Sequence, residues 1–147
     1  MGGTTGLRLS HEGSQPGKGR QDDLWKHTCC EAFVWTPSGY YEFNFAPSGD
    51  WAAYRFTGYR EGMSKPELVA PVAEASRHGD SWRLDAFVNL LSIPGLADDV
   101  PVRLGLSAVL EMKDGGLSYW ALAHPSDKPD FHHPDSFALT LPPPEPA

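Results

Sequence analysis

Hydrophobic and polar residues alternate with a period of two over residues 29–57. Three runs follow one another: CCEAFVWT (29–36), YYEFNFA (40–46) and WAAYRFT (51–57). Short turn sequences separate them, PSG after the first run and PSGD after the second. Because alternation sends every second side chain to one face of a strand, and tight turns reverse the chain, this region predicts an antiparallel meander of three strands.

The second half of the chain carries the same pattern. Its predicted strands are SWRLDAFVNL (81–90), VRLGLSAVLEM (102–112), LSYWALAH (117–124) and SFALTL (136–141). The KDGG sequence before the third of these contains an Asp-Gly pair, which is typical of a tight hairpin. Sustained helical spacing of apolar residues is lacking, apart from a turn around GMSKPEL. We therefore predict an all-β fold, either an antiparallel sandwich of immunoglobulin-like kind or an open barrel.

The two ends of the chain differ in composition from the region between them. Residues 1–23 contain six glycines and one short strand-like piece, GLRLS, which predicts a flexible N-terminal segment. The final sequence LPPPEPA carries four prolines, which cannot join the interior of a sheet. We predict one domain over 24–141, followed by a proline-rich tail at 142–147.

Alternation also assigns the side chains of the meander to two faces. The predicted core face carries Cys30, Ala32, Val34, Tyr41, Phe43, Phe45, Ala52, Tyr54 and Phe56. The other face carries Glu31, Phe33, Trp35, Tyr40, Glu42, Asn44, Trp51, Ala53 and Arg55. Aromatic rings mixed with carboxylate, amide and guanidinium groups are what sugar recognition requires. A solvated sheet face with cross-strand pairs such as Glu31 with Arg55 gives the same pattern, so both interpretations stay open.

Composition narrows the classes of partner. The chain has 147 residues, 12 basic against 19 acidic, and a net charge of -7. A phosphate backbone or an anionic membrane would be repelled on average, so we expect neither nucleic acid nor membrane as partner.

Cys29 and Cys30 are neighbours, whose side chains diverge on a strand, so we predict two free thiols. No basic-then-apolar leader or roughly 18-residue apolar run is present, which predicts a cytoplasmic protein.

The sequence DKPDFHHPD at 127–135 concentrates three aspartates and two adjacent histidines. Adjacent histidines diverge in an extended segment, so at most one of His132 and His133 can join His124 or Asp130 at a metal. A haem would need an axial methionine, Met63 or Met112, opposite one of these histidines. A third interpretation is that the prolines stiffen a loop that forms the rim or the scaffold of a binding site.

Several motifs together resemble a known family. LWKHTCCEAFV, YYEFNFAPSGDWAAYRFTGYR, LGLSAVLE, LSYWALAHP and KPDFHHPDSF are similar to sequences of the bacterial DOMON-like domain proteins. That branch of the DOMON superfamily is similar in turn to the family 9 carbohydrate-binding modules. The resemblance runs from about Leu24 to about Leu141 and implies a β-sandwich that binds a sugar or a haem in a pocket at one face. The Leu-Trp and Glu of its motif fall on Leu24, Trp25 and Glu31.

One departure from the family concerns the N-terminus. Members of this branch have additional strands before the Leu-Trp motif, where this chain has only its glycine-rich segment. Either the sandwich lacks its N-terminal strands or the chain starts late. An exposed sheet edge left in this way would favour a homodimer.

These observations predict a non-catalytic binding module for a saccharide or a similar polyhydroxylated molecule. A haem-binding redox module is the first alternative. A metal-dependent enzyme that uses His124, His132 and His133 is the second. The candidate ligand-binding residues are Trp25, Glu31, Asn44, Trp51, Arg55, His124, Asp130, His132 and His133.

Overall fold

The computed structural model describes residues 19–79, 81–89, 93, 101–121 and 130–141. Within these residues the chain forms strands and two short 3-10 helices, η1 (Leu24–Lys26) and η3 (Pro134–Ser136). The strands are β1 (Cys29–Thr36), β2 (Gly39–Phe45), β3 (Trp51–Phe56), β4 (Val72–His78), β5 (Ser81–Phe87), β6 (Val102–Glu111), β7 (Leu117–Ala121) and β8 (Leu139–Leu141). All but β4 coincide with a run predicted as a strand.

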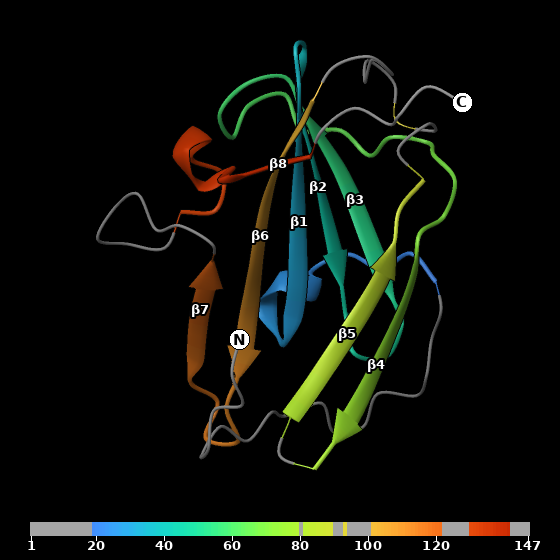
Figure 1. The fold of residues 1–147 in the computed structure, drawn as a ribbon, viewed down its shortest axis with the longest axis vertical. Coiled ribbons are helices and arrows are strands. Elements are labelled where there is room, and N and C mark those ends of the chain that lie inside the picture. The colour runs from blue at the N-terminus through green and yellow to red at the C-terminus, as the bar shows by residue number, and fades with distance from the viewer. Residues whose placement is uncertain (1–18, 80, 90–92, 94–100, 122–129, 142–147) are drawn as a thin grey trace.

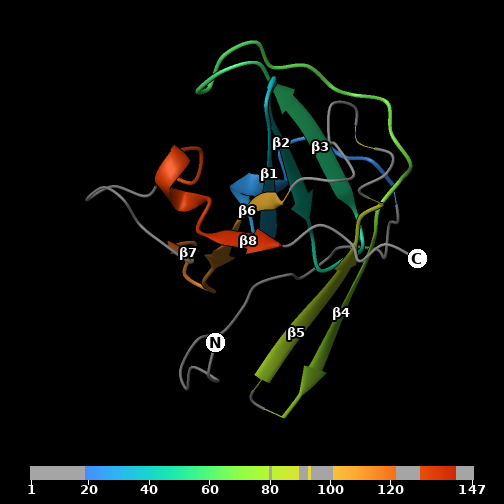
Figure 2. The same ribbon diagram turned by 45° about the horizontal axis from the view of Figure 1, so that its top comes forward.

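The strands form two antiparallel sheets. The larger sheet has the order β3-β2-β1-β6. Two strands pair with β6 on the side away from β1: β7 pairs with its C-terminal part and β8 with its N-terminal part. The smaller sheet is the hairpin β4-β5. Figure 1 and Figure 2 show this hairpin running at a slant beside the β3 end of the larger sheet. The prediction of an all-β sandwich is confirmed.

The face of the larger sheet that packs on the β4-β5 hairpin, here called the hairpin face, holds one apolar cluster. Val34, Tyr41 and Phe43 form its centre and are almost fully buried. Ala73 of β4 is buried in the same cluster, and Leu84 of β5 packs against it. Burial of these aromatic and branched side chains fixes the smaller sheet on the larger one.

The opposite face, here called the loop face, holds a second apolar cluster. It contains Phe33, Tyr40, Ala52, Tyr54, Phe56, Val109, Phe131 and Phe137. The loop over residues 130–137 covers this face, and Leu24 of η1 packs against it. Gly105 allows the loop to come close, since a Cβ there would lie 3.1 Å from the carbonyl oxygen of Ser136. Both faces of the sheet are therefore covered, and β2 is buried along nearly its whole length.

The register of β3 corrects the predicted faces. Tyr41 pairs with Arg55 and Phe45 with Trp51, so Trp51 and Arg55 lie on the hairpin face. Tyr54 pairs with Glu42 and lies on the loop face. The prediction had these faces of β3 reversed. The reason is the turn after β2, where the Ala46 N–H bonds the Asp50 carbonyl at 2.9 Å and sets a register that alternation alone cannot determine.

The outer edge of β3 is partly occupied by other segments. The Gln21 N–H donates to the Trp51 carbonyl at 2.8 Å, and the Trp51 N–H donates to the Gly19 carbonyl at 3.0 Å. Arg55 and Ser64 exchange two further backbone bonds. Residues 19–23, which belong to the predicted flexible segment, thus lie against β3, whereas GLRLS and the tail 142–147 fall outside the described residues.

Cys29 and Cys30 are free thiols, as predicted. Cys29 is fully buried on the loop face, and Cys30 pairs with Phe45 on the hairpin face. Burial raises the pKa of Cys30 to about 11, and it raises the pKa of Cys29 further. Neither thiol is ionised near neutral pH, so both act as packing groups.

Candidate functional site

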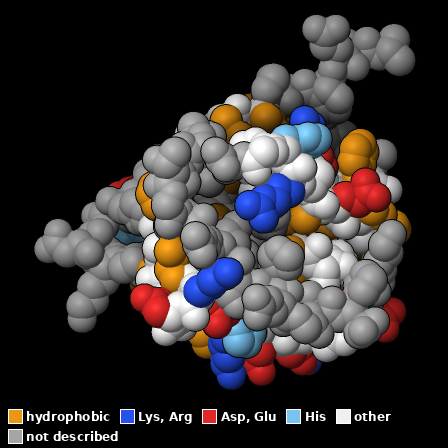
Figure 3. Space-filling model, turned by 90° about the horizontal axis from the view of Figure 1, so that it is seen from below, with side chains coloured by type: hydrophobic (Ala, Val, Ile, Leu, Met, Phe, Trp, Pro, Cys, Tyr) orange, Lys and Arg blue, Asp and Glu red, His pale blue; other side chains and the backbone are white. Residues whose placement is uncertain are grey.

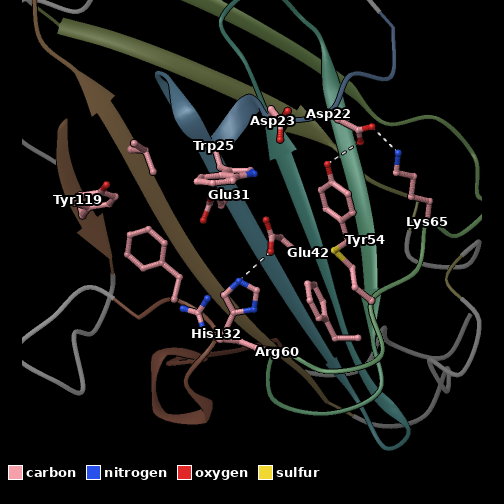
Figure 4. A pocket seen from close by; sticks show the side chains of 14 residues that line it. Asp22, Asp23, Trp25, Glu31, Glu42, Tyr54, Arg60, Lys65, Tyr119 and His132 are labelled. Atoms are coloured by element: carbon pink, nitrogen blue, oxygen red, sulfur yellow. Dashed lines mark hydrogen bonds and ion pairs between the residues drawn. The ribbon is translucent and has the colours of Figure 1, made fainter. Parts of the chain in front are cut away.

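A cavity of about 940 Å³ opens on the loop face of the larger sheet. Its floor is formed by β1, β2, β3 and β6, and its walls come from the segment before β1, the turn after β3, β7 and the 130–137 loop (Figure 4). The lining residues are Asp22, Asp23, Trp25, Glu31, Glu42, Tyr54, Phe56, Arg60, Met63, Lys65, Val109, Tyr119, Phe131 and His132. The size is that of a site for a small organic molecule.

Two buried carboxyl groups, Glu31 and Glu42, lie side by side in the floor. Each residue is only 6% exposed. Glu31 pairs with Asn44 and Phe33 pairs with Glu42, which makes the two glutamates diagonal neighbours on adjacent strands. Burial, and next the negative charge of Glu42, raise the pKa of Glu31 to about 8. At neutral pH Glu31 is therefore mostly a neutral carboxylic acid.

His132 connects Glu42 to the loop that covers this face. Its Nε2 lies 3.2 Å from Oε1 of Glu42, and its Nδ1 lies 2.7 Å from the Tyr40 hydroxyl. The ring stands edge-on to Phe33 and to Phe56, at centroid distances of 5.0 and 5.1 Å. Both ring nitrogens have partners, so the imidazole is held in one orientation.

The loop that carries His132 is fixed by its own hydrogen bonds. The Ser136 hydroxyl lies 2.6 Å from the Phe131 carbonyl and 2.7 Å from the His133 carbonyl. His133 caps η3, because its Nδ1 accepts the Asp135 N–H at 3.1 Å. Since Phe131 and His132 line the cavity while His133 serves the helix, the two adjacent histidines have separate roles.

One rim of the cavity joins the turn after β3 to this loop. Asp130 accepts hydrogen bonds from the Tyr59 hydroxyl and, at 2.9 Å, from Nη2 of Arg60. The Arg60 N–H also donates to the Tyr40 hydroxyl at 3.0 Å. Burial alone would raise the pKa of Asp130, but the bonds from Tyr59 and Arg60 outweigh it and lower that pKa. Asp130 is thus a charged anchor of the rim.

The opposite rim consists of the segment before β1 and the chain after the β3 turn. Asp22 accepts a hydrogen bond from the Tyr54 hydroxyl at 2.9 Å and forms an ion pair with Lys65. Trp25 lies on η1 beside the two glutamates, as Figure 4 shows, and is 49% exposed. The half-exposed indole next to buried carboxyl groups leaves an apolar surface available to a ligand.

Asn44 lies deeper on the same face. Its side chain is fully buried, directly opposite Glu31 in the strand register. Neither its amide nitrogen nor its amide oxygen has a hydrogen-bond partner among the described residues. Buried amides are normally hydrogen-bonded, so Asn44 is an exception among the described residues.

The structure brings together only part of the predicted site. Trp25, Glu31 and His132 line the cavity, and Asn44 lies beside them on the loop face. Trp51 does not belong there, because it is buried on the hairpin face with the Arg20 guanidinium 5.2 Å from its ring.

Arg55 is likewise misplaced by the prediction, since it lies on the hairpin face and donates to the Ser38 hydroxyl at 3.3 Å. Asp130 anchors the rim, and His133 caps η3 instead of lining the cavity. His124 lies outside the described residues.

The prediction omitted several lining residues, of which Glu42 is the most important. Alternation predicts Glu42 on the same face as Glu31, but the predicted site does not include it. Tyr54 and Phe56 were assigned to the wrong face, so only the register of β3 reveals them. Arg60 is not one of the omitted residues in the same sense, because its place just beyond a strand end in GYREGM makes it a candidate from the sequence.

The described residues contain no group of three or more histidine, cysteine or acidic side chains close enough to hold a metal ion. Met63, one of the two methionines considered for haem, lines the same cavity as His132. Within the described part of the chain, no helix has the length and apolar character needed to cross a membrane. Seen from the lower end of Figure 1, described basic, acidic and hydrophobic side chains are interspersed (Figure 3).

The chain is a β-sandwich with a cavity of about 940 Å³ on one face of its larger sheet. No family model, curated protein or solved structure matches this chain. The resemblance to DOMON-like domains therefore stays a prediction, and the residues that line the cavity are the basis for the proposed function.

Proposed function

We propose that this protein is a binding module whose cavity takes a saccharide or a similar polyhydroxylated small molecule. The observation that carries the proposal is the half-exposed indole of Trp25 beside two buried carboxyl groups, Glu31 and Glu42, in one cavity. A pyranose has flat apolar faces that stack on an indole ring, while its hydroxyl groups bond to carboxyl oxygens.

The remaining cavity walls support this kind of ligand. Tyr54, Phe56 and Tyr119 supply further aromatic surface, and the Arg60 guanidinium supplies donors. The hydrogen bonds that hold Arg60 and His132 reduce the ordering cost on binding, because these side chains are already in place. The resemblance to the family 9 carbohydrate-binding modules points to the same class of ligand.

The test is isothermal titration calorimetry with a panel of monosaccharides and disaccharides, preceded by a thermal-shift screen. For any sugar that binds, Trp25→Ala should weaken affinity about tenfold through loss of stacking. Trp35→Ala is the matched control, since Trp35 is 40% exposed and does not line the cavity. Equal affinities of wild type and Trp25→Ala would place the sugar elsewhere, and a panel without any binding would refute the proposal.

A haem site is the second candidate, favoured by the presence of Met63 and His132 in one cavity. The test is an absorption spectrum before and after addition of hemin. A haem held by these residues gives a sharp Soret band that is lost in Met63→Leu and in His132→Ala. Because both nitrogens of His132 are already hydrogen-bonded, ligation would have to displace Glu42 or Tyr40.

A further inference from the structure

The two glutamates in the cavity floor lack the cationic partners that the other charged lining residues have. Arg60 is paired with Asp130, and Lys65 with Asp22. Among the described residues, no lysine or arginine forms an ion pair with Glu31 or Glu42, and the His132 ring is the partner of Glu42.

One oxygen of each carboxyl group remains available. Ser107 donates to Oε2 of Glu31 at 3.2 Å, and His132 faces Oε1 of Glu42 at 3.2 Å. Oε1 of Glu31 and Oε2 of Glu42 have no hydrogen-bond partner within the described part of the chain. Two adjacent acceptors in one cavity floor, on residues that are only 6% exposed, suit a donor that carries positive charge.

The surroundings are suited to a cation as well. Aromatic rings attract a positive charge over their faces. In Figure 4, Trp25 and Tyr54 lie near the two carboxyl groups, and Phe56 lines the same cavity.

We propose that the ligand carries a protonated amino group, which binds between Glu31 and Glu42 while its hydroxyl-bearing body lies along Trp25. This inference rests on the proposed function and narrows the ligand to an amino sugar or a similar amino alcohol. An ammonium group has three N–H donors, and the free oxygens of Glu31 and Glu42 accept two of them. The positive charge also removes the repulsion that the two carboxylates would otherwise exert on each other.

The experiment compares three probes that share one ring: glucosamine, glucose and N-acetylglucosamine. Calorimetric titration at pH 6.5 keeps the amine protonated, as amino groups of this kind lose their proton near pH 8. We expect glucosamine to bind at least about tenfold more tightly than either neutral sugar, because its hydrogen bonds are charge-assisted. Glu31 should release its proton on binding, which titration in two buffers of different ionisation enthalpy detects.

The variants Glu31→Gln and Glu42→Gln should lose most of the preference for glucosamine and keep any affinity for glucose. Glu74→Gln is the matched control, since Glu74 lies on the exposed side of β4 away from the cavity. The wild-type comparison needs no variant, so it stands even if one glutamine variant does not fold.

The outcomes separate this inference from the proposed function. Equal binding of glucosamine and glucose overturns the amino-group inference and leaves the saccharide proposal intact. Binding of a simple amine such as cadaverine without binding of any sugar supports the amino-group site and overturns the saccharide proposal. Binding of none of these probes overturns both.

Discussion

The ionisation of Glu31 should make the folded chain less stable as pH rises through neutrality. Burial, together with the charge of Glu42, raises the pKa of Glu31 from 4.5 to about 8. In the unfolded chain this carboxyl group loses its proton near pH 4.5, so between these values the folded state holds one more proton. Stability that is fully present below the lower pKa is therefore lost progressively and is gone above the upper one.

The magnitude follows from the size of the change in pKa. One proton difference weakens folding by about 1.4 kcal/mol for each pH unit, so the loss from pH 5 to pH 8 approaches 4 kcal/mol. Glu31→Gln has nearly the same shape and stays neutral at every pH. The free energy of unfolding of the variant relative to wild type should therefore rise by about the same amount over this range.

The assay is urea unfolding followed by tryptophan fluorescence at each pH from 5 to 9, with both proteins measured side by side. Other titrating groups are common to the two proteins and cancel in the difference. Glu74→Gln on the exposed side of β4 serves as control and should run parallel to wild type. Parallel curves for wild type and Glu31→Gln, within about 0.5 kcal/mol, would refute the idea that the buried carboxyl is neutral at pH 7.

Three further changes test other parts of the structure. Gly39→Ala should lower the free energy of unfolding by about 3 kcal/mol or more in urea titrations, since the residue has φ of +142° and a Cβ would lie 2.0 Å from a backbone oxygen. Gly79→Ala, with φ of +59° and open space around it, should lose only about 1 kcal/mol. His132→Ala should lose about 2–4 kcal/mol in the same assay, because a buried phenol and a buried carboxyl lose their partner. Asp130→Asn should lose about 1 kcal/mol at pH 7 and less as pH falls to 3, because the hydrogen bonds that lower the Asp130 pKa stabilise the fold only while the carboxylate is ionised.

Strand positions were predictable from the sequence wherever alternation was strong. The run at 29–36 coincides with β1 because large apolar residues alternate there and a tight turn ends it. β4 was missed, since VAEASRH combines small and charged side chains with little hydrophobic contrast. β4 is held in the fold by its ladder with β5 and by Ala73, which is buried against the larger sheet.

The binding site was less predictable because it depends on contacts between distant segments. Trp25, Glu31 and His132 could be found from residue type and motif. The partnership of His132 with Glu42 could not, because it brings a loop near the C-terminus onto the second strand. Alternation predicts Trp51 and Arg55 on the wrong face because both faces of the sheet are covered, and apolar residues on both sides remove the contrast that would indicate the register.

The way β4 and β5 are attached affects which part of the fold opens first by local unfolding. Within the described part of the chain, their ladder joins them only to each other, and most side chains of β4 are exposed. Opening this hairpin therefore breaks no hydrogen bond of the β3-β2-β1-β6 ladder. Amide protons of the hairpin should exchange with solvent through this local opening, at lower free energy than those of β1 and β2. The cavity lies on the other side of the sheet, so it can keep its shape while the hairpin opens and closes.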